Sequence, residues 1–351
     1  MKNKTPEISV LIPIYNVEKY ISRCLQSVLA QTIYKKNILV ELILVNDCTP
    51  DNSLEIAKQE LSKIQNNEYI VVKIIEHEKN LGIGSARKTA FNNSSGKYII
   101  CVDSDDYVEP TYLEDLYYEA IKTDADITIC DFAFEINSNK TKHNFIKEQD
   151  PKKLIKQILD GFDNPSACRI LYKKALIVDN NINFDNNINF AEDMLFNLKL
   201  LNFVNKISYV DKVLYLYSFD NQDSLTRKPN AIYNFYNNFT QVIQTYDEFC
   251  TTRNIFNKDE YVFKLKVYFK KSLVLSCMSS NHVDKKFIKL INSTYKELDA
   301  YLIKNIEDTK FKKLYMLCIL KNLYIVCLIF CLLTRIKRKI YSIVSHFRSY
   351  S

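Results

Sequence analysis

Between residues 7 and 134 the sequence alternates short apolar runs, rich in β-branched residues, with amphipathic stretches. Runs of this kind predict buried strands, at Ile8–Ile14, Leu39–Val45, Tyr69–Ile75, Tyr98–Val102 and Asp126–Phe132. In the first intervening stretch Val17, Ile21 and Leu25 recur at helical spacing. Strands that alternate with helices predict an α/β fold with a mainly parallel central sheet, because parallel neighbours need a crossover connection.

Further helices are predicted where apolar residues recur at helical spacing. Asp51 and Asn52 can cap a helix that runs to Lys63, and other helices are predicted over Ser85–Asn92, Lys152–Leu159 and Phe190–Leu201. In the last of these, Leu195, Leu198 and Leu201 would face inward. Together the patterns predict a sheet domain over residues 1–226, a helical C-terminal region over 227–310 and a tail over 311–351.

The cysteines argue against a metal-bound or disulfide-bonded scaffold. There are ten, none in a C-x-x-C spacing, and only four histidines accompany them. No charged and then apolar leader precedes Ile8. We therefore expect reduced thiols and a cytoplasmic location.

Positive charge is concentrated at the C-terminus. The whole chain carries a formal charge of +7, to which residues 309–351 contribute +9, so the remaining residues carry −2. A nucleic-acid-binding protein would carry its basic residues on the folded domain. The charge distribution therefore argues against a nucleic-acid partner.

The tail has a composition suited to a membrane surface. Its apolar segment Leu314–Leu333 is interrupted by Lys321 and Asn322, which leaves 323–333 uninterrupted. A spanning helix needs about 20 apolar residues. Basic residues follow, and such residues are attracted to anionic lipids. We expect a peripheral anchor on the inner face of the cell membrane, and the alternative is a core helix.

Three segments that contain polar residues lie at the ends of predicted strands. They are Pro13–Asn16, Asn46–Asp51 and Asp103–Asp106. In open α/β sheets ligands bind beyond the carboxyl ends of the strands. Any one of these segments could be only a turn or a helix cap. Their recurrence at successive strand ends indicates a binding site.

Asp103 and Asp105 are one residue apart at a predicted strand end. In extended geometry both side chains would project to the same side, where one cation could face both. Mg²⁺ or Mn²⁺ typically takes one or two protein carboxylates and fills its remaining positions with water and substrate phosphates. The D-x-D pattern alone is weak, but here it is compatible with a metal–diphosphate substrate.

Two further motifs leave alternatives open. Glu192 and Asp193 open a predicted helix, where acids often only complement the helix dipole, but Asp193 could also serve as a general base. Arg87 stands where a dinucleotide-binding loop would have its third glycine after Gly82 and Gly84. It could instead face an anionic ligand or form a structural ion pair. The histidines are isolated, and no role is predicted for them.

Five segments, taken together and in this order, resemble family 2 glycosyltransferases, which are inverting enzymes of the Rossmann-like GT-A fold. They are Ile8–Asn16, Asn46–Ser53, Asn80–Arg87, Val102–Tyr107 and Glu192–Asn197. The resemblance covers about residues 7 to 226. It implies that the predicted sheet binds a nucleotide-sugar.

The resemblance implies a nucleotide-binding role for residues at the first strand ends. Pro13 and Tyr15 would border the nucleotide base, and Asp47 would accept a hydrogen bond from it. Arg87 would help to close this pocket, and Ser104 would lie beside the donor.

The resemblance also implies the catalytic residues. Asp103 would contact the ribose or the metal, and Asp105 would bind the Mn²⁺ or Mg²⁺ that bridges the diphosphate. Asp193 would be the base that deprotonates the acceptor hydroxyl. Glu192 and Arg169 would lie on the acceptor side.

By the same resemblance, the chain would transfer a sugar from a nucleotide donor, a UDP-hexose or UDP-N-acetylhexosamine, to a glycan or lipid-linked glycan in surface-polysaccharide or lipooligosaccharide synthesis. Processive synthases of the family carry a Q-x-x-R-W motif, and this chain has no tryptophan. Transfer of a single sugar is therefore favoured. The alternative is a catalytically silent binding protein that keeps the fold and acts as a scaffold at the membrane.

Overall fold

The computed structural model describes residues 4–64, 67–136, 139–162, 166–219, 221, 231–279 and 285–305. The chain forms two compact units. The first comprises residues 1–228 and 244–256, and the second comprises residues 229–243 and 257–351. The predicted tail over 311–351, on which the expected membrane anchor depends, lies outside the described residues.

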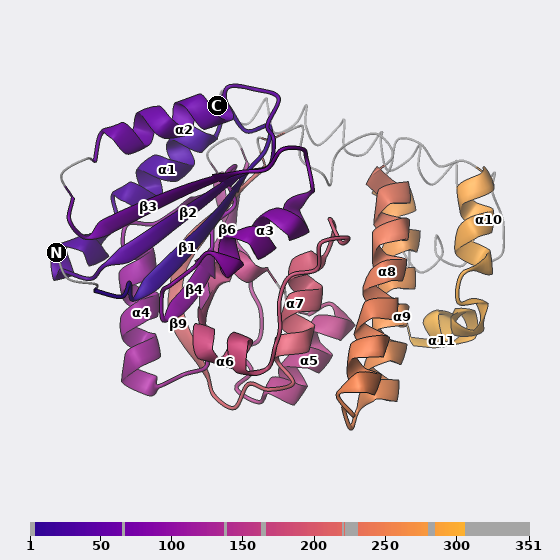
Figure 1. Cartoon of the computed structure of the whole chain (residues 1–351). Coiled ribbons are helices and arrows are strands. Elements are labelled where there is room, and N and C mark those ends of the chain that lie inside the picture. The colour runs from indigo at the N-terminus through magenta and orange to yellow at the C-terminus, as the bar shows by residue number, and fades with distance from the viewer. Residues whose placement is uncertain are drawn as a thin grey trace, which may run out of the picture. The chain divides into compact units, whose positions relative to one another are not determined.

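The first unit contains a sheet whose parallel part follows the sequence prediction. Its strands are β1 (Ile8–Ile14), β2 (Val40–Asn46), β3 (Ile70–Glu76) and β4 (Tyr98–Cys101), in the spatial order β3-β2-β1-β4 (Figure 1). Every residue of β1 and β2 is buried. Strands covered on both faces read as continuous apolar runs, and this is why their positions were predictable.

The rest of the sheet is mixed. It contains β5 (Tyr107–Val108), β6 (Ile127–Ile136), β7 (Asn139–Lys142), β8 (Ile170–Lys173) and β9 (Ile207–Ser218). Strand β8 joins β4 to β6 by antiparallel pairing on both sides, and β9 runs parallel to β6 and antiparallel to β5. The predicted α/β fold is confirmed. The antiparallel strands β5 and β8 are too short to give a periodic signal.

Helices cover both faces of the parallel strands. They are α1 (Ile21–Leu29), α2 (Ser53–Ser62) and α3 (Ile83–Asn92). Lys58 of α2 pairs with Glu76 of β3, whereas Lys73 donates to the carbonyl of Asn93 at the end of α3. Positions 73 and 76 face opposite sides of a strand, so α2 and the end of α3 lie on opposite faces.

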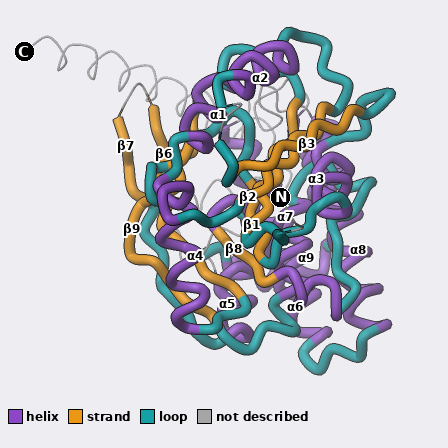
Figure 2. The backbone as a smooth tube through the Cα atoms, turned by 60° about the vertical axis from the view of Figure 1, so that its left-hand side comes forward, coloured by secondary structure: helices purple, strands orange, loops and turns teal. Residues whose placement is uncertain are grey.

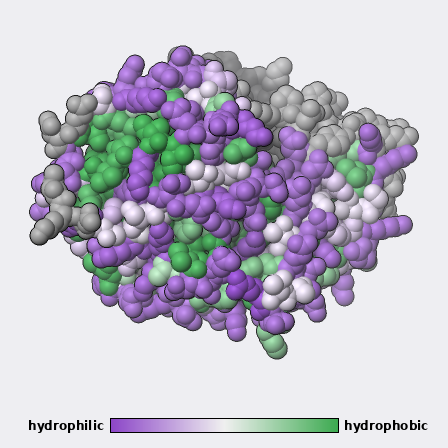
Figure 3. Space-filling model, viewed as in Figure 1, coloured by the Kyte–Doolittle hydropathy of each residue, from purple (hydrophilic) through white to green (hydrophobic). Residues whose placement is uncertain are grey.

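Other helices of the first unit are α4 (Tyr112–Thr123), α5 (Pro151–Asp160), α6 (Lys174–Asp179) and α7 (Glu192–Leu200), shown in tube form in Figure 2. Leu195, Leu198 and Leu201 are buried, as predicted. Strand β3 is an edge strand, so its apolar side chains reach the surface, and Val71 is 40% exposed. Figure 3 shows hydrophobic side chains gathered over this end of the sheet.

The second unit is helical, as the sequence predicted for this region. Its described elements are α9 (Lys258–Ser279), α10 (Lys285–Ser293), α11 (Asp299–Asn305) and part of α8 (Ala231–Thr252). The buried Lys270 pairs with Asp299 and donates to the carbonyl of Tyr295 at 3.0 Å. Across the described ranges, no helix combines the length and apolarity that a membrane span requires.

Candidate active site

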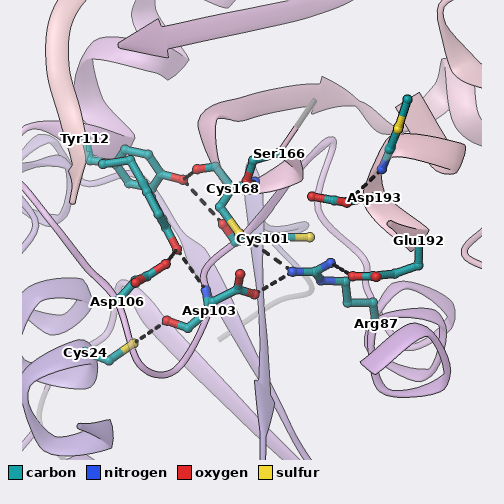
Figure 4. Close-up of polar contacts among 12 residues, drawn as sticks. Cys24, Arg87, Cys101, Asp103, Asp106, Tyr112, Ser166, Cys168, Glu192 and Asp193 are labelled. Atoms are coloured by element: carbon teal, nitrogen blue, oxygen red, sulfur yellow. Dashed lines mark hydrogen bonds and ion pairs between the residues drawn. The ribbon is translucent and has the colours of Figure 1, made fainter. Parts of the chain in front are cut away.

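Four segments that lie far apart in the sequence meet beyond the carboxyl end of β4. They are the turn after β4, helix α3, residues 166–169 and the first turn of α7 (Figure 4). Asp103, Arg87, Glu192 and Asp193 come from these segments and lie near one another in this view. Asp103, Glu192 and Asp193 are therefore brought together around the guanidinium group of Arg87.

The acidic residues after β4 form a turn, which we call the acidic turn (residues 103–106). The Asp106 N–H donates to the carbonyl of Asp103 at 3.0 Å, so the extended geometry assumed from the sequence does not hold. The alternation of exposure persists nevertheless. Asp103 and Asp105 are half-buried, whereas Ser104 and Asp106 are only 6% and 1% exposed. Two carboxylates thus remain accessible to a ligand.

Asp106 is held inside the protein. Its carboxylate accepts hydrogen bonds from the Tyr215 hydroxyl at 2.5 Å and the Ser218 N–H at 2.8 Å. Burial, followed by the negative charges of Asp105 and Asp103, raises the pKa of Asp106 well above its ordinary value. Asp105 and Asp103 thus lie close enough to Asp106 for their charges to act on it.

Arg87 links the two acidic segments. It projects from α3, and its side chain is only 4% exposed. One guanidinium nitrogen lies 2.6 Å from the Asp103 carboxylate, and the other pairs with Glu192. The ion pair with neighbouring carboxylates, one of the alternatives that the sequence left open, is therefore formed. The predicted contact of Arg87 with the donor stays a prediction.

The first turn of α7 provides the second pair of acids. Glu192 is buried, and the half-buried Asp193 accepts a hydrogen bond from the Met194 N–H at 2.8 Å. Desolvation raises the pKa of both carboxyl groups, and the positive charge of Arg87 opposes this shift. A carboxylate with a raised pKa is a stronger base than an ordinary aspartate, so Asp193 has the property that proton abstraction requires.

Asp47, at the end of β2, organises the start of α3. Its carboxylate accepts from the N–H groups of Leu81 and Gly82 at 2.8 and 2.7 Å, and it lies 2.7 Å from His77 Nδ1. The other ring nitrogen of His77 lies 2.9 Å from the Thr89 hydroxyl. The predicted contact of Asp47 with a nucleotide base stays a prediction. His77 follows β3 at the same edge of the sheet, but no local pattern in the sequence indicates its contact with Asp47.

Two glycines bring α3 against the segment that precedes α7. Gly82 has a φ of +88°, and a Cβ there would overlap the Asn189 side chain. A Cβ at Gly84 would overlap the carbonyl oxygens of Asp185 and Ile188. Because these contacts tolerate no side chain, the position of the Glu192–Asp193 segment depends on the start of α3.

The other predicted site residues lie around this centre. Pro13 is buried in β1, and Tyr15, just beyond the strand, is 40% exposed. Arg169 is 1% exposed, and its guanidinium lies 3.8 Å from the centroid of the Phe145 ring. The predicted base contacts of Pro13 and Tyr15 and the acceptor contact of Arg169 remain predictions.

The acidic turn fits the oxygen-donor chemistry of Mg²⁺ or Mn²⁺. Within the described ranges no group of three or more His, Cys, Asp or Glu residues forms a cage. These ions need no such cage, because they bind through one or two carboxylates together with substrate phosphates. Asp103 and Asp105 offer half-buried carboxylates of this kind, and Asp103 Oδ2 accepts no hydrogen bond from the described residues.

Comparisons with known proteins relate the chain to glycosyltransferases. The "Glycosyl transferase family 2" profile matches residues 9–177. The putative glycosyltransferase EpsH of Bacillus subtilis is 31% identical over 186 residues, which are 52% of this chain and 51% of EpsH. The Staphylococcus aureus poly(ribitol-phosphate) beta-N-acetylglucosaminyltransferase TarS is 29% identical over 180 residues, 51% of this chain and 29% of TarS. The matched segments thus span about half the length of EpsH and less than a third of TarS.

Solved structures share the fold over most of the chain. TarS 1–349 in complex with UDP-GlcNAc superposes with a TM-score of 0.57 and 23% identity, covering 90% of this chain and 89% of that one. A mannosyltransferase of Pyrobaculum calidifontis in complex with GDP-Man and Mn²⁺ gives 0.50 and 13%, covering 92% and 88%. At these identities the likeness establishes the GT-A fold. The profile match identifies residues 9–177, just under half of the chain, as a glycosyl transferase family 2 segment.

Proposed function

We propose that the chain is a metal-dependent inverting glycosyltransferase. It transfers one sugar from a UDP-hexose or UDP-N-acetylhexosamine to a hydroxyl of a glycan or lipid-linked glycan in cell-surface polysaccharide synthesis. One observation carries the proposal: a half-buried acidic turn and a desolvated acidic pair converge on one buried arginine. The family 2 profile match and the UDP-GlcNAc complex of TarS support the donor class.

In this proposal the acidic turn binds the donor. Asp105 and Asp103 would hold Mn²⁺ or Mg²⁺, which supplies positive charge to stabilise the diphosphate as it leaves. The mannosyltransferase of this fold that was solved with Mn²⁺ supports this choice of ion. Tyr15 and Asp47, at the ends of β1 and β2, would border the nucleotide base.

Asp193 would accept the proton of the acceptor hydroxyl. The oxygen then attacks the anomeric carbon from the face opposite the nucleoside diphosphate, and the configuration inverts. Desolvation favours this role because it raises the pKa of Asp193 and so strengthens the carboxylate as a base. Arg87 limits the rise, which keeps a larger fraction of the group ionised.

The acceptor side and the membrane location are proposed from the sequence. The tail beyond residue 311 combines apolar and basic residues, and this composition suits an anionic membrane surface next to lipid-linked acceptors. Deletion of residues 311–351 should release the protein from anionic vesicles while transfer to a soluble acceptor persists. A truncated protein that still pellets with vesicles would refute this anchor.

A panel of nucleotide-sugars, assayed for donor hydrolysis with MnCl₂ and with EDTA, tests the function itself. We expect hydrolysis of at least one UDP-sugar that depends on the metal and is lost on chelation. Tight UDP binding without hydrolysis or transfer of any donor would instead favour the catalytically silent scaffold.

A further inference from the structure

One hydroxyl group of strand β9, that of Tyr215, contacts both ends of the acidic turn. The backbone N–H of Asp103 donates to the Tyr215 hydroxyl at 3.3 Å, and this hydroxyl donates to the Asp106 carboxylate at 2.5 Å. The Ser218 N–H donates to the other Asp106 oxygen at 2.8 Å. The first and last residues of the turn are therefore fixed to the same strand.

Backbone pairing strengthens this attachment. The two residues that follow the turn form β5 and pair antiparallel with β9, Tyr107 opposite Leu216 and Val108 opposite Tyr215. These hydrogen bonds are also shielded from solvent, because Asp106 is 1% exposed and Tyr215 is 2% exposed. Hydrogen bonds in such surroundings are expensive to break without replacement.

The three acids of the turn consequently differ in what they can do. Both oxygens of Asp106 accept hydrogen bonds from β9, so this carboxylate is unable to reach a ligand. Asp103 and Asp105 remain half-buried. Asp105 is connected to the segment beyond β9 as well, since Asn221 Nδ2 donates to it at 2.9 Å.

We propose that Asp106 and Tyr215 are positioning residues that hold Asp103 and Asp105 in the orientation in which they bind the divalent cation of the donor complex. The inference rests on the proposed function, because it presupposes a cation at the turn. It adds that the third acid of the Asp-Ser-Asp-Asp motif anchors the turn and never contacts the metal. A loosened turn would have to become ordered each time the cation bound, and this would lower the affinity for the cation.

The test is Mn²⁺ affinity in the presence of UDP, measured on the full chain by electron paramagnetic resonance of free Mn²⁺. Tyr215→Phe removes only the bridging hydroxyl, and we expect the Mn²⁺ dissociation constant to rise about tenfold, as the loss of a buried hydrogen bond implies. Saturating Mn²⁺ should restore most of the turnover. A merely structural role would lower the melting temperature and leave the Mn²⁺ dependence unchanged.

A matched control comes from the neighbouring tyrosine. Tyr112 is fully buried, its ring lies 6.2 Å from that of Tyr215, and its hydroxyl donates to the Cys168 carbonyl at 2.6 Å. Tyr112→Phe therefore removes a buried hydroxyl without removing a hydrogen bond to the acidic turn. We expect it to cost stability but to leave the Mn²⁺ affinity at the wild-type value.

The outcomes separate the two proposals. Unchanged Mn²⁺ affinity in Tyr215→Phe, in a protein whose Asp105→Asn variant has lost Mn²⁺, would overturn the positioning role alone. A wild-type protein that binds no Mn²⁺ with UDP would overturn both the metal dependence and this inference. Asp106→Asn provides a second variant, because its amide has one acceptor where the carboxylate has two, and it should weaken Mn²⁺ at least as much as Tyr215→Phe.

Discussion

The two acidic pairs of the site share a partner and differ in their surroundings. Asp103 and Glu192 both pair with Arg87, yet the Asp103 side chain is 28% exposed and the Glu192 side chain only 7%. The acidic turn lies at the rim of the sheet, whereas Glu192 and Asp193 begin a helix packed into the first unit. The same residue types thus occupy two different dielectric environments.

This difference in exposure shows how the carboxylates of one site can have different tasks. A half-buried carboxylate that water still reaches can bind a cation at little desolvation cost. Desolvation raises the pKa of Glu192 and Asp193, and this makes the pair suited to proton transfer. The account therefore assigns the metal to the acidic turn and the proton to the helix start.

Among the variants that test this division of metal binding and proton transfer, Asp193→Asn should have the largest effect. The amide keeps the shape of the side chain and is unable to accept the acceptor proton, so kcat should fall about 100- to 10,000-fold. UDP affinity with Mn²⁺ should stay at the wild-type value, as measured by calorimetric titration. Undiminished transfer would remove the base assignment.

Arg87→Gln tests the link between the two pairs. It removes the positive charge that lowers the pKa of Asp193, so the pKa of this carboxyl should rise. Because the base acts when ionised, the acidic limb of the pH–kcat profile should move to higher pH. Loss of a buried ion-pair partner should also cost about 3–5 kcal/mol of stability, read from denaturant unfolding. A limb that stays in place or moves to lower pH contradicts the link.

Asp105→Asn acts on the other pair. It removes a negative charge from the proposed metal site, so the Mn²⁺ concentration for half-maximal activity should rise at least about tenfold. The pH profile at saturating Mn²⁺ should remain that of the wild type, because the helix-start pair is untouched. A shifted profile with unchanged Mn²⁺ dependence would reverse the division of tasks.

Gly84→Ala gives the smallest and most selective effect. The new Cβ would overlap the carbonyls of Asp185 and Ile188, just before α7, and relief of this overlap should cost about 1–3 kcal/mol. We expect kcat to fall while Mn²⁺ and UDP affinities hold. Ser94→Ala near the far end of α3 is the control, since its hydroxyl donates locally to Phe91. Equal losses of kcat and of Mn²⁺ affinity would show that the two pairs move together.

The sequence predicted the parts of the site that local patterns encode. Buried parallel strands leave continuous apolar runs, so the ends of β1, β2 and β4, and with them Asp47 and the acidic turn, were located in advance. Glu192 and Asp193 are predicted at a helix start because apolar residues at helical spacing follow them. Resemblance to a family supplied their expected tasks.

Long-range packing was not predictable. Arg87 and Glu192 are 105 positions apart, and nothing local indicates that the arginine pairs with this carboxylate. The burial of Asp106 depends on Tyr215, another distant residue on β9. A pattern of acids in a turn does not say which acid points inward, and an isolated histidine does not reveal that it supports Asp47.

The most direct test of the division of tasks is a crystal of the full chain grown with UDP and MnCl₂ and measured at the manganese absorption edge. The account predicts an anomalous peak in contact with the Asp105 carboxylate, next to the diphosphate, with Glu192 and Asp193 outside the coordination shell. A peak bound by Glu192 or Asp193, or UDP bound with no peak at the acidic turn, would contradict it.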